Sequence, residues 1–140
     1  MRREGTSVRM VYSEALMDHF HRPRRVGRFD SADADVGKGE AGSVATGGVI
    51  NLQLKLDSSS RSSVGDACFL AYGPPPLIAA GSWLAESVCG KSLEQIEAIT
   101  HHDVVKALEL PAARVHCAFL AEDALRAAIQ DLRNKERAYI

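Results

Sequence analysis

The spacing of hydrophobic and polar residues changes period about halfway along the chain. Between residues 49 and 56 apolar and polar side chains alternate, with Ile50 as the one departure, which predicts a strand with one face on a core. The serine-rich tract 57–63 predicts a hairpin loop, and a second strand is expected at about 64–72, antiparallel to the first. The stretch 27–48 is rich in small and polar residues and indicates an irregular loop or a weak edge strand.

Helical patterns flank these strands. Ser13 is suited to cap a short helix over 14–21, which Pro23 ends. After the strands, apolar residues recur at i, i+4 and i+7, which predicts a helix from Leu77 to about Gly90. Capping boxes and a last apolar stripe predict three more helices, at 93–98, 101–108 and about 114–135. Strands come before most of the helices without regular alternation, so we predict an α+β fold, a small antiparallel sheet with helices on one face.

Composition bounds the class of protein. A length of 140 residues predicts a single domain, placed at 12–140, after a flexible N-terminus at 1–11. With a net charge of −1, the chain has no excess of positive charge with which to bind nucleic acid. No apolar run reaches the roughly 20 residues of a membrane span. Three cysteines, an odd number, argue against a disulfide framework and for a reducing compartment.

The N-terminus gives a weak indication of location. Arg2, Arg3 and Arg9 fall in a hydroxyl-containing segment with one acidic residue, as in organelle transit peptides. The segment is short for a whole transit peptide, and a frayed basic N-terminus explains it equally. We therefore expect either the mitochondrial matrix, or a complex on its matrix side, or the bacterial cytoplasm.

Several short motifs occur in the order known from one protein family. The longest is His116-Cys117-Ala118-Phe119-Leu120-Ala121-Glu122-Asp123-Ala124. The others are Tyr12-Ser13-Glu14, Asp18-His19, Arg22-Pro23-Arg24-Arg25-Val26-Gly27, Leu52-Gln53-Leu54-Lys55, Gly90-Lys91-Ser92-Leu93 and Leu108-Glu109-Leu110-Pro111. Through them, residues 12–136 resemble the IscU/NifU N-terminal scaffold of iron–sulfur cluster assembly. The resemblance implies that family's α+β fold and a function connected with iron–sulfur clusters.

The resemblance also implies where cluster ligands would lie, and this chain departs from that pattern. The family carries Ala-Cys-Gly-Asp where this chain reads Ala45-Thr46-Gly47-Gly48, so a thiolate is lost at Thr46 and a carboxylate at Gly48. It carries Tyr-Gly-Cys-Gly where this chain reads Tyr72-Gly73-Pro74-Pro75-Pro76, so a second thiolate is lost at Pro74. Since a [2Fe–2S] cluster normally takes four protein ligands, we expect the chain alone to assemble no cluster.

Two ligand positions retain their side chains, His116 and Cys117. By the resemblance, Cys117 is a candidate acceptor of persulfide sulfur from a cysteine desulfurase, and Cys117 with His116 forms a vestigial metal site. The position of Cys117 near a helix N-terminus predicts a lowered thiol pKa. The alternative is a thiol that simply packs between the last helix and the sheet.

Other residues have weaker assignments. Leu110, Pro111 and Arg114 are partner-binding candidates, because they stand where the family has its Leu-Pro-Pro-Val-Lys chaperone-binding segment. Cys68 and Cys89 fall where the family has no cysteine, so we expect both to fill core or surface positions. His19 and His21 are expected on the polar side of the first helix.

Two hypotheses of function follow. In the first, the chain is a degenerate scaffold homologue that serves as an interaction module or as an accessory subunit of a larger assembly, mitochondrial in one version. In the second, it remains in cluster assembly as a sulfur acceptor or weak iron or cluster carrier through Cys117. No resident cofactor is expected, except iron, zinc or [2Fe–2S] held across a dimer or partner interface. The partners would be a cysteine desulfurase-like protein or subunits of a large complex, and no catalytic motif indicates an enzyme.

Overall fold

The structure, a computed structural model, describes residues 11–30 and 32–138. The flexible segment predicted over residues 1–11 therefore lies outside the described residues, apart from Val11. In chain order the elements are α1 (Glu14–His21), β1 (Val36–Ser43), the short helix η2 (Val44–Thr46), β2 (Gly48–Leu56), β3 (Val64–Tyr72), α2 (Pro75–Val88), α3 (Leu93–Glu97), α4 (His101–Leu108), the short helix η3 (Ala112–Arg114) and α5 (His116–Ala138).

The strands form an antiparallel sheet in the order β1-β2-β3. The predicted hairpin is confirmed, because β2 and β3 pair along their length with Leu52 opposite Phe69. Alternation places Ile50, Leu52 and Leu54 on one face, where each is fully buried. The polar residues between them point to the other face, and the predicted α+β class is confirmed.

The stretch 27–48, expected to be an irregular loop or a weak edge strand, contains the regular edge strand β1. Two of its inward positions are Gly37 and Gly39, because α5 packs directly on the strand backbone. A Cβ atom at Gly39 would lie 2.0 Å from the carbonyl oxygen of Ala124. Glycine allows this close approach, and it also removes the alternation by which a strand is predicted.

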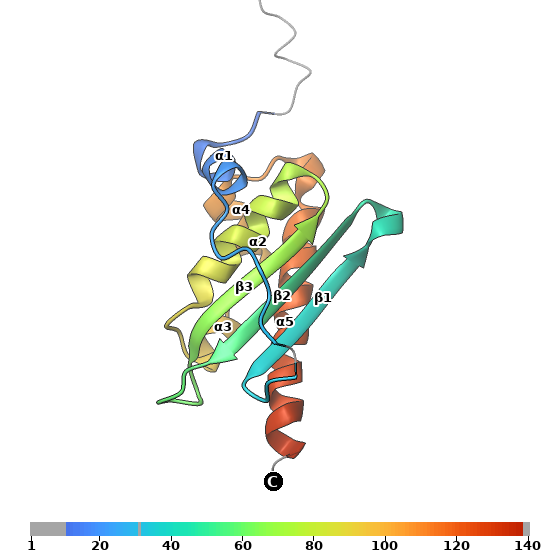
Figure 1. Ribbon diagram of the computed structural model, residues 1–140. Helices are drawn as coiled ribbons and strands as arrows, with labels where there is room; N and C mark the ends of the chain where they lie inside the picture. Colours follow the sequence, from blue (N-terminus) through green and yellow to red (C-terminus); the bar gives the residue numbers. More distant parts are fainter. Residues whose placement is uncertain (1–10, 31, 139–140) are drawn as a thin grey trace, which may run out of the picture.

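The sheet has two different faces (Figure 1). Helices α2 and α5 pack on the inner face, and α1 packs against α2 and α4. The chain between α1 and β1 crosses the outer face, where it runs beside β3. Two backbone hydrogen bonds of 3.0 Å hold it there, from Gly27 N–H to the Phe69 carbonyl and from Phe69 N–H to the Arg25 carbonyl.

The helices begin and end within three residues of their predicted positions. Helix α5 begins at His116 rather than at about residue 114, because the preceding residues form η3. The expected position of His19 on a polar face is wrong. Since α1 turns that face toward α2, His19 is 8% exposed and its Nδ1 lies 2.8 Å from Oγ of buried Ser82. His21 is exposed as predicted, and no helix within the described ranges is long and apolar enough to span a membrane.

Candidate functional site

A cavity of about 500 Å³ lies where the first residues of β2, α2 and α5 come together. Its lining residues are Thr46, Gly47, Gly48, Pro74, Leu77, Arg114, His116, Cys117, Phe119 and Leu120. The positions at which the resemblance places cluster ligands, far apart in sequence, therefore share one cavity. Their side chains determine what this cavity can bind.

The first wall is the turn between β1 and β2. Thr46 ends η2, and Gly47 follows with a φ of 93°, a left-handed conformation that glycine adopts without strain. The Thr46 hydroxyl donates a 3.0 Å hydrogen bond to the carbonyl of Ser43. This hydroxyl stabilises the turn, and a neutral hydroxyl is a poor ligand for iron compared with a thiolate.

The second wall is the entry to α2. Pro74 has the extended φ of −69° and ψ of 159°, and Pro75 begins the helix, where its missing N–H costs no helical hydrogen bond. Behind them, Leu77 fills the space beside the turn. A Cβ atom placed at Gly48 or at Gly73 would lie 3.0 Å from Leu77 Cδ2. An apolar side chain thus packs beside the position at which the resemblance places a carboxylate.

Cys117, the second residue of α5, is 1% exposed. Burial raises the pKa of its thiol to about 11, and the positive charge of Arg114 offsets only part of that effect. The predicted lowering of this pKa by the helix N-terminus is therefore wrong, because desolvation of the thiolate outweighs the helix dipole. At neutral pH the buried group is a thiol.

Two aromatic side chains of α5, His116 and Phe119, line the cavity, and one of them packs on α4. His116 is exposed, and its Nε2 lies 3.8 Å from Cys117 Sγ. The ring of Phe119 stacks on that of His101 at a centroid distance of 4.0 Å. His101 is fixed in turn by Glu122, whose Oε1 lies 2.8 Å from His101 Nδ1 and from its backbone nitrogen.

The donor set of this cavity is small. Cys117 supplies a thiol and His116 an imidazole, whereas Thr46, Gly48 and Pro74 supply neither thiolate nor carboxylate. Across residues 11–30 and 32–138, no group of three or more His, Cys, Asp or Glu side chains is arranged to hold a metal ion. A tetrahedral zinc site or a [2Fe–2S] cluster needs more protein ligands than this cavity offers.

Comparison with known proteins places this chain in a family. A protein-family model described as the NifU-like N terminal domain matches residues 11–138. The chain belongs to this family. It is 44% identical over 129 residues to the iron–sulfur cluster assembly scaffold protein IscU of Escherichia coli (strain K12), covering 92% of this chain and 99% of that protein.

Two further comparisons agree with this assignment. The chain is 44% identical over 127 residues to the protein of the same name from Buchnera aphidicola subsp. Acyrthosiphon pisum, covering 91% of this chain and 98% of that one. The N-terminal part of a nitrogen-fixing NifU-like protein from Brucella abortus has a TM-score of 0.67 at 17% identity, covering 88% of this chain and 94% of that chain, which shows the shared fold. A member of this scaffold family is not an enzyme, as the sequence predicts.

In this NifU-like domain the expected partner-binding segment is only partly exposed to a partner. Leu110 is 8% exposed and belongs to the hydrophobic core, so it offers a partner little surface, and its role in partner binding stays a prediction. Pro111 and Arg114 are half-buried, and Arg114 turns toward the cavity. Its Nε is buried and has no hydrogen-bond partner among the described residues. Arg114 therefore belongs to the cavity wall as well as to this segment.

The two other cysteines lie away from the cavity. Cys68 is 6% exposed on β3, and burial raises the pKa of its thiol to about 11. Cys89 follows α2, and its Sγ lies 3.3 Å from the carbonyl oxygen of Ala85. Neither side chain lines the cavity, in keeping with their expected role as filler. The residues that sequence reasoning missed are Leu77, Phe119 and Leu120, whose apolar character gives no signal of a site.

Proposed function

We propose that this chain acts in iron–sulfur cluster assembly as an IscU-like protein that does not complete a cluster site of its own. The observation that carries the proposal is the shared cavity, in which Cys117 is the single thiol and His116 the single imidazole. Because a [2Fe–2S] cluster normally takes four protein ligands, a cluster here needs ligands from a second copy or from a partner. The chain would then contribute mainly by binding other proteins of the process.

The surface around the cavity supports protein contact. Val44, Tyr72 and Phe119 are exposed to 67%, 61% and 46%, and all three belong to the segments that form the cavity walls or adjoin them. Exposed apolar side chains that gather at one place mark interaction surfaces more often than isolated ones do. A cysteine desulfurase or another assembly protein is the partner class that family membership supports, and an accessory role in a larger assembly is the same proposal with a different partner.

A second candidate function is sulfur acceptance by Cys117. In that step the Cys117 thiolate attacks the outer sulfur of a desulfurase persulfide, forms Cys117–S–S⁻ and releases the desulfurase thiolate. The position of Cys117 in the cavity beside Arg114, whose charge favours the thiolate, supports this candidate. Its burial and raised pKa oppose the step unless a partner opens the cavity. The compartment, mitochondrial matrix or bacterial cytoplasm, stays a prediction.

Restoring the missing thiols tests the main proposal. The experiment compares the natural chain with Thr46→Cys/Pro74→Cys and with Thr46→Cys/Pro74→Cys/Cys117→Ser, each incubated anaerobically with Fe(II), cysteine and a cysteine desulfurase. Iron, acid-labile sulfide and the visible spectrum are then measured per chain. We expect no cluster on the natural chain, a [2Fe–2S] spectrum on the double variant and loss of that spectrum in the triple variant.

Other results would overturn the proposal or favour one of its alternatives. A full cluster on the natural chain alone would overturn it, since the described cavity would then be sufficient. Half a cluster per chain would mean that Cys117 and His116 of two copies share a cluster, which favours a carrier role. Persulfide on the natural chain that Cys117→Ser removes and Cys89→Ser leaves unchanged would establish the sulfur-acceptor function.

A further inference from the structure

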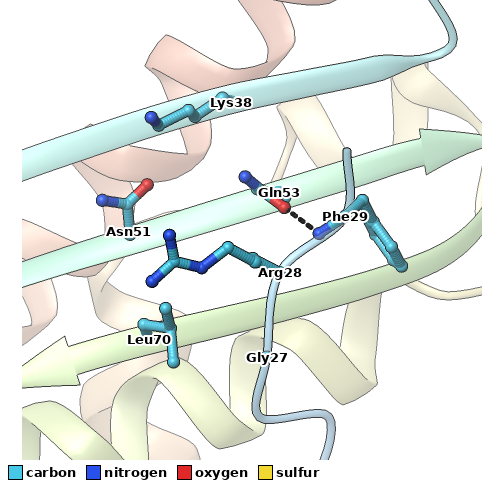
Figure 2. Close-up of a pocket in the computed structure, with 7 residues that line it drawn as sticks. All are labelled: Gly27, Arg28, Phe29, Lys38, Asn51, Gln53 and Leu70. Atoms are coloured by element: carbon cyan, nitrogen blue, oxygen red, sulfur yellow. Dashed lines mark hydrogen bonds between the residues drawn. The ribbon is translucent and has the colours of Figure 1, made fainter. Parts of the chain in front are cut away.

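A second cavity, of about 120 Å³, lies on the outer face of the sheet (Figure 2). It is lined by Gly27, Arg28, Phe29, Lys38, Asn51, Gln53 and Leu70. Arg28 comes from the segment that crosses the sheet, Lys38 from β1, and Asn51 and Gln53 from β2. The cavity is therefore separate from the one that holds Cys117, on the face away from α5.

Two positive charges face this cavity, and none of its lining residues carries a carboxylate. Figure 2 shows Arg28 and Lys38 on opposite sides of the two β2 amides. In the part of the chain that the structure describes, neither side chain forms an ion pair. The nearby carboxylate of Glu40 lines the adjoining hollow, where Glu40 pairs in register with Asn51. Two unpaired cations around one hollow favour an anionic ligand.

The amide of Gln53 is fixed in the orientation that an anion requires. Gln53 is 5% exposed, and its Oε1 accepts a hydrogen bond from the backbone N–H of Phe29. Because the oxygen is held in this way, Nε2 points away from Phe29 toward the space between Lys38 and Asn51 (Figure 2). No acceptor from the described residues bonds to this NH₂ group. This unused donor faces the cavity and can bond to an acceptor oxygen of a ligand.

The side-chain amide of Asn51 is a further polar group that a ligand could bind. Its Oδ1 is buried and has no hydrogen-bond partner among the described residues. Since no hydrogen bond fixes this amide, either its oxygen or its NH₂ group can face a ligand. Asn51 can therefore accept a P–OH proton or donate to an oxyanion, whichever the ligand presents.

We propose that Arg28, Lys38, Asn51 and Gln53 form a binding site for a phosphate group, free or at the end of a small molecule. The volume is well below the roughly 300 Å³ of common ligand pockets, so the site suits one small ion or one terminal group. The donors come from three chain segments on different sides of the hollow, which fits the diverging oxygens of a tetrahedral anion better than a planar carboxylate. This site is independent of the cluster-assembly proposal.

Titration with inorganic phosphate tests the site. The folded natural chain is followed by ¹H–¹⁵N NMR at pH 7 and constant ionic strength, with acetate as the planar anion and chloride as the background ion. We expect saturable shifts of the Gln53 side-chain NH₂ and the Phe29 amide with phosphate, and at least about tenfold weaker binding of acetate. A small phosphate monoester that competes with free phosphate would show that a terminal phosphate is also accepted.

Matched variants distinguish phosphate binding at this site from nonspecific attraction by the positive charges of the protein. Arg28→Gln and Lys38→Gln should each weaken phosphate binding about tenfold, since each removes a charge-assisted hydrogen bond. Lys106→Gln, on the exposed side of α4, removes the same charge elsewhere and should leave binding unchanged. Glu40→Gln should tighten binding. Linear, non-saturating shifts, equal binding of acetate, or equal weakening by Lys106→Gln would overturn the proposal.

Discussion

His116 Nε2 lies 3.8 Å from Cys117 Sγ, yet the two side chains belong to different environments. The imidazole is exposed at the mouth of the cavity, whereas the thiol is 1% exposed at its inner wall. Burial raises the thiol pKa to about 11, although the positive charge of Arg114 acts in the opposite direction. The pair therefore combines an imidazole that solvent reaches with a thiol that the fold shields from solvent.

The reactivity of Cys117 should reflect this protection. In a Cys68→Ser/Cys89→Ser background, we expect alkylation of Cys117 by iodoacetamide to be slow at pH 7 and to rise up to pH 10 without a plateau, because the pKa is about 11. Arg114→Gln should slow it further, since the Arg114 charge favours the thiolate. Lys106→Gln is the matched control. A plateau below pH 8 would show an activated thiol and contradict the structure.

The carboxylate of Glu122, which accepts hydrogen bonds from His101, should stabilise the contact between α4 and α5. Burial raises the Glu122 pKa, but the side-chain and backbone hydrogen bonds of His101 and the charge of Arg126 outweigh it, so the net pKa is lowered. Glu122→Gln should cost about 2 kcal/mol of unfolding free energy at pH 7, measured with urea, because it weakens charged hydrogen bonds. As pH falls through the lowered pKa the natural chain should lose this advantage. The neighbouring exposed Asp123→Asn should change stability by less than about 0.5 kcal/mol, and equal effects would contradict the assignment.

The elements that sequence could predict are those with local signals. Ser13 and Ser92 each accept a hydrogen bond from the helix they precede, and both helices begin where their caps indicate. The last helix begins later than its apolar stripe suggests, because η3 precedes it. Caps and alternation are encoded within a few residues, so they are visible without the fold.

Features that depend on packing between distant segments could not be predicted. Gly39 gives no strand signal because its inward neighbour is the backbone of α5 rather than a side chain. The pKa of Cys117 depends on burial that a helix position alone does not reveal. The resemblance indicated the positions Thr46, Gly48 and Pro74, but the outer cavity with Arg28 has no motif at all. Its donors become neighbours only through strand register and the crossing segment.

Burial of His19 predicts a pH dependence of stability. Desolvation of the ring lowers the pKa of His19 most, and the positive charge of Arg24 lowers it further. The carboxylates of Glu86 and Asp18 act in the opposite direction but are outweighed. The unfolded chain therefore binds the proton more readily, and stability should fall as pH drops through about 6.5, the pKa of an unperturbed histidine. Above that pH the effect is absent.

The comparison of His19→Asn with His102→Asn isolates this effect. Asparagine can still reach Ser82 with a polar atom but does not titrate, so His19→Asn should flatten the loss of unfolding free energy between pH 7 and pH 5. His102 is exposed, and its replacement should leave that slope unchanged. If His19→Asn retains the full slope, the acid sensitivity resides in other groups.

The contact between β1 and α5 links the fold to the cavity. A Cβ atom at Gly39 would lie 2.0 Å from the Ala124 carbonyl oxygen and 2.4 Å from the Ala128 nitrogen, both backbone atoms that cannot rotate away. Gly39→Ala should therefore push α5 from the sheet and cost about 3 kcal/mol of unfolding free energy, measured with urea. Glu40→Ala, one residue further along on the outer face, should cost less than about 0.5 kcal/mol.

Gly39→Ala should also affect the candidate site, because the first turn of α5 contains Cys117. If α5 moves as a rigid helix, Gly39→Ala loosens the packing that buries the thiol, and alkylation of Cys117 at pH 8 should accelerate while Glu40→Ala leaves it unchanged. A Gly39→Ala chain as stable as the natural one would show that β1 can shift at no cost. Loss of stability without faster alkylation would show instead that the N-terminal turn of α5 is held by α2 and α4 independently of the sheet edge.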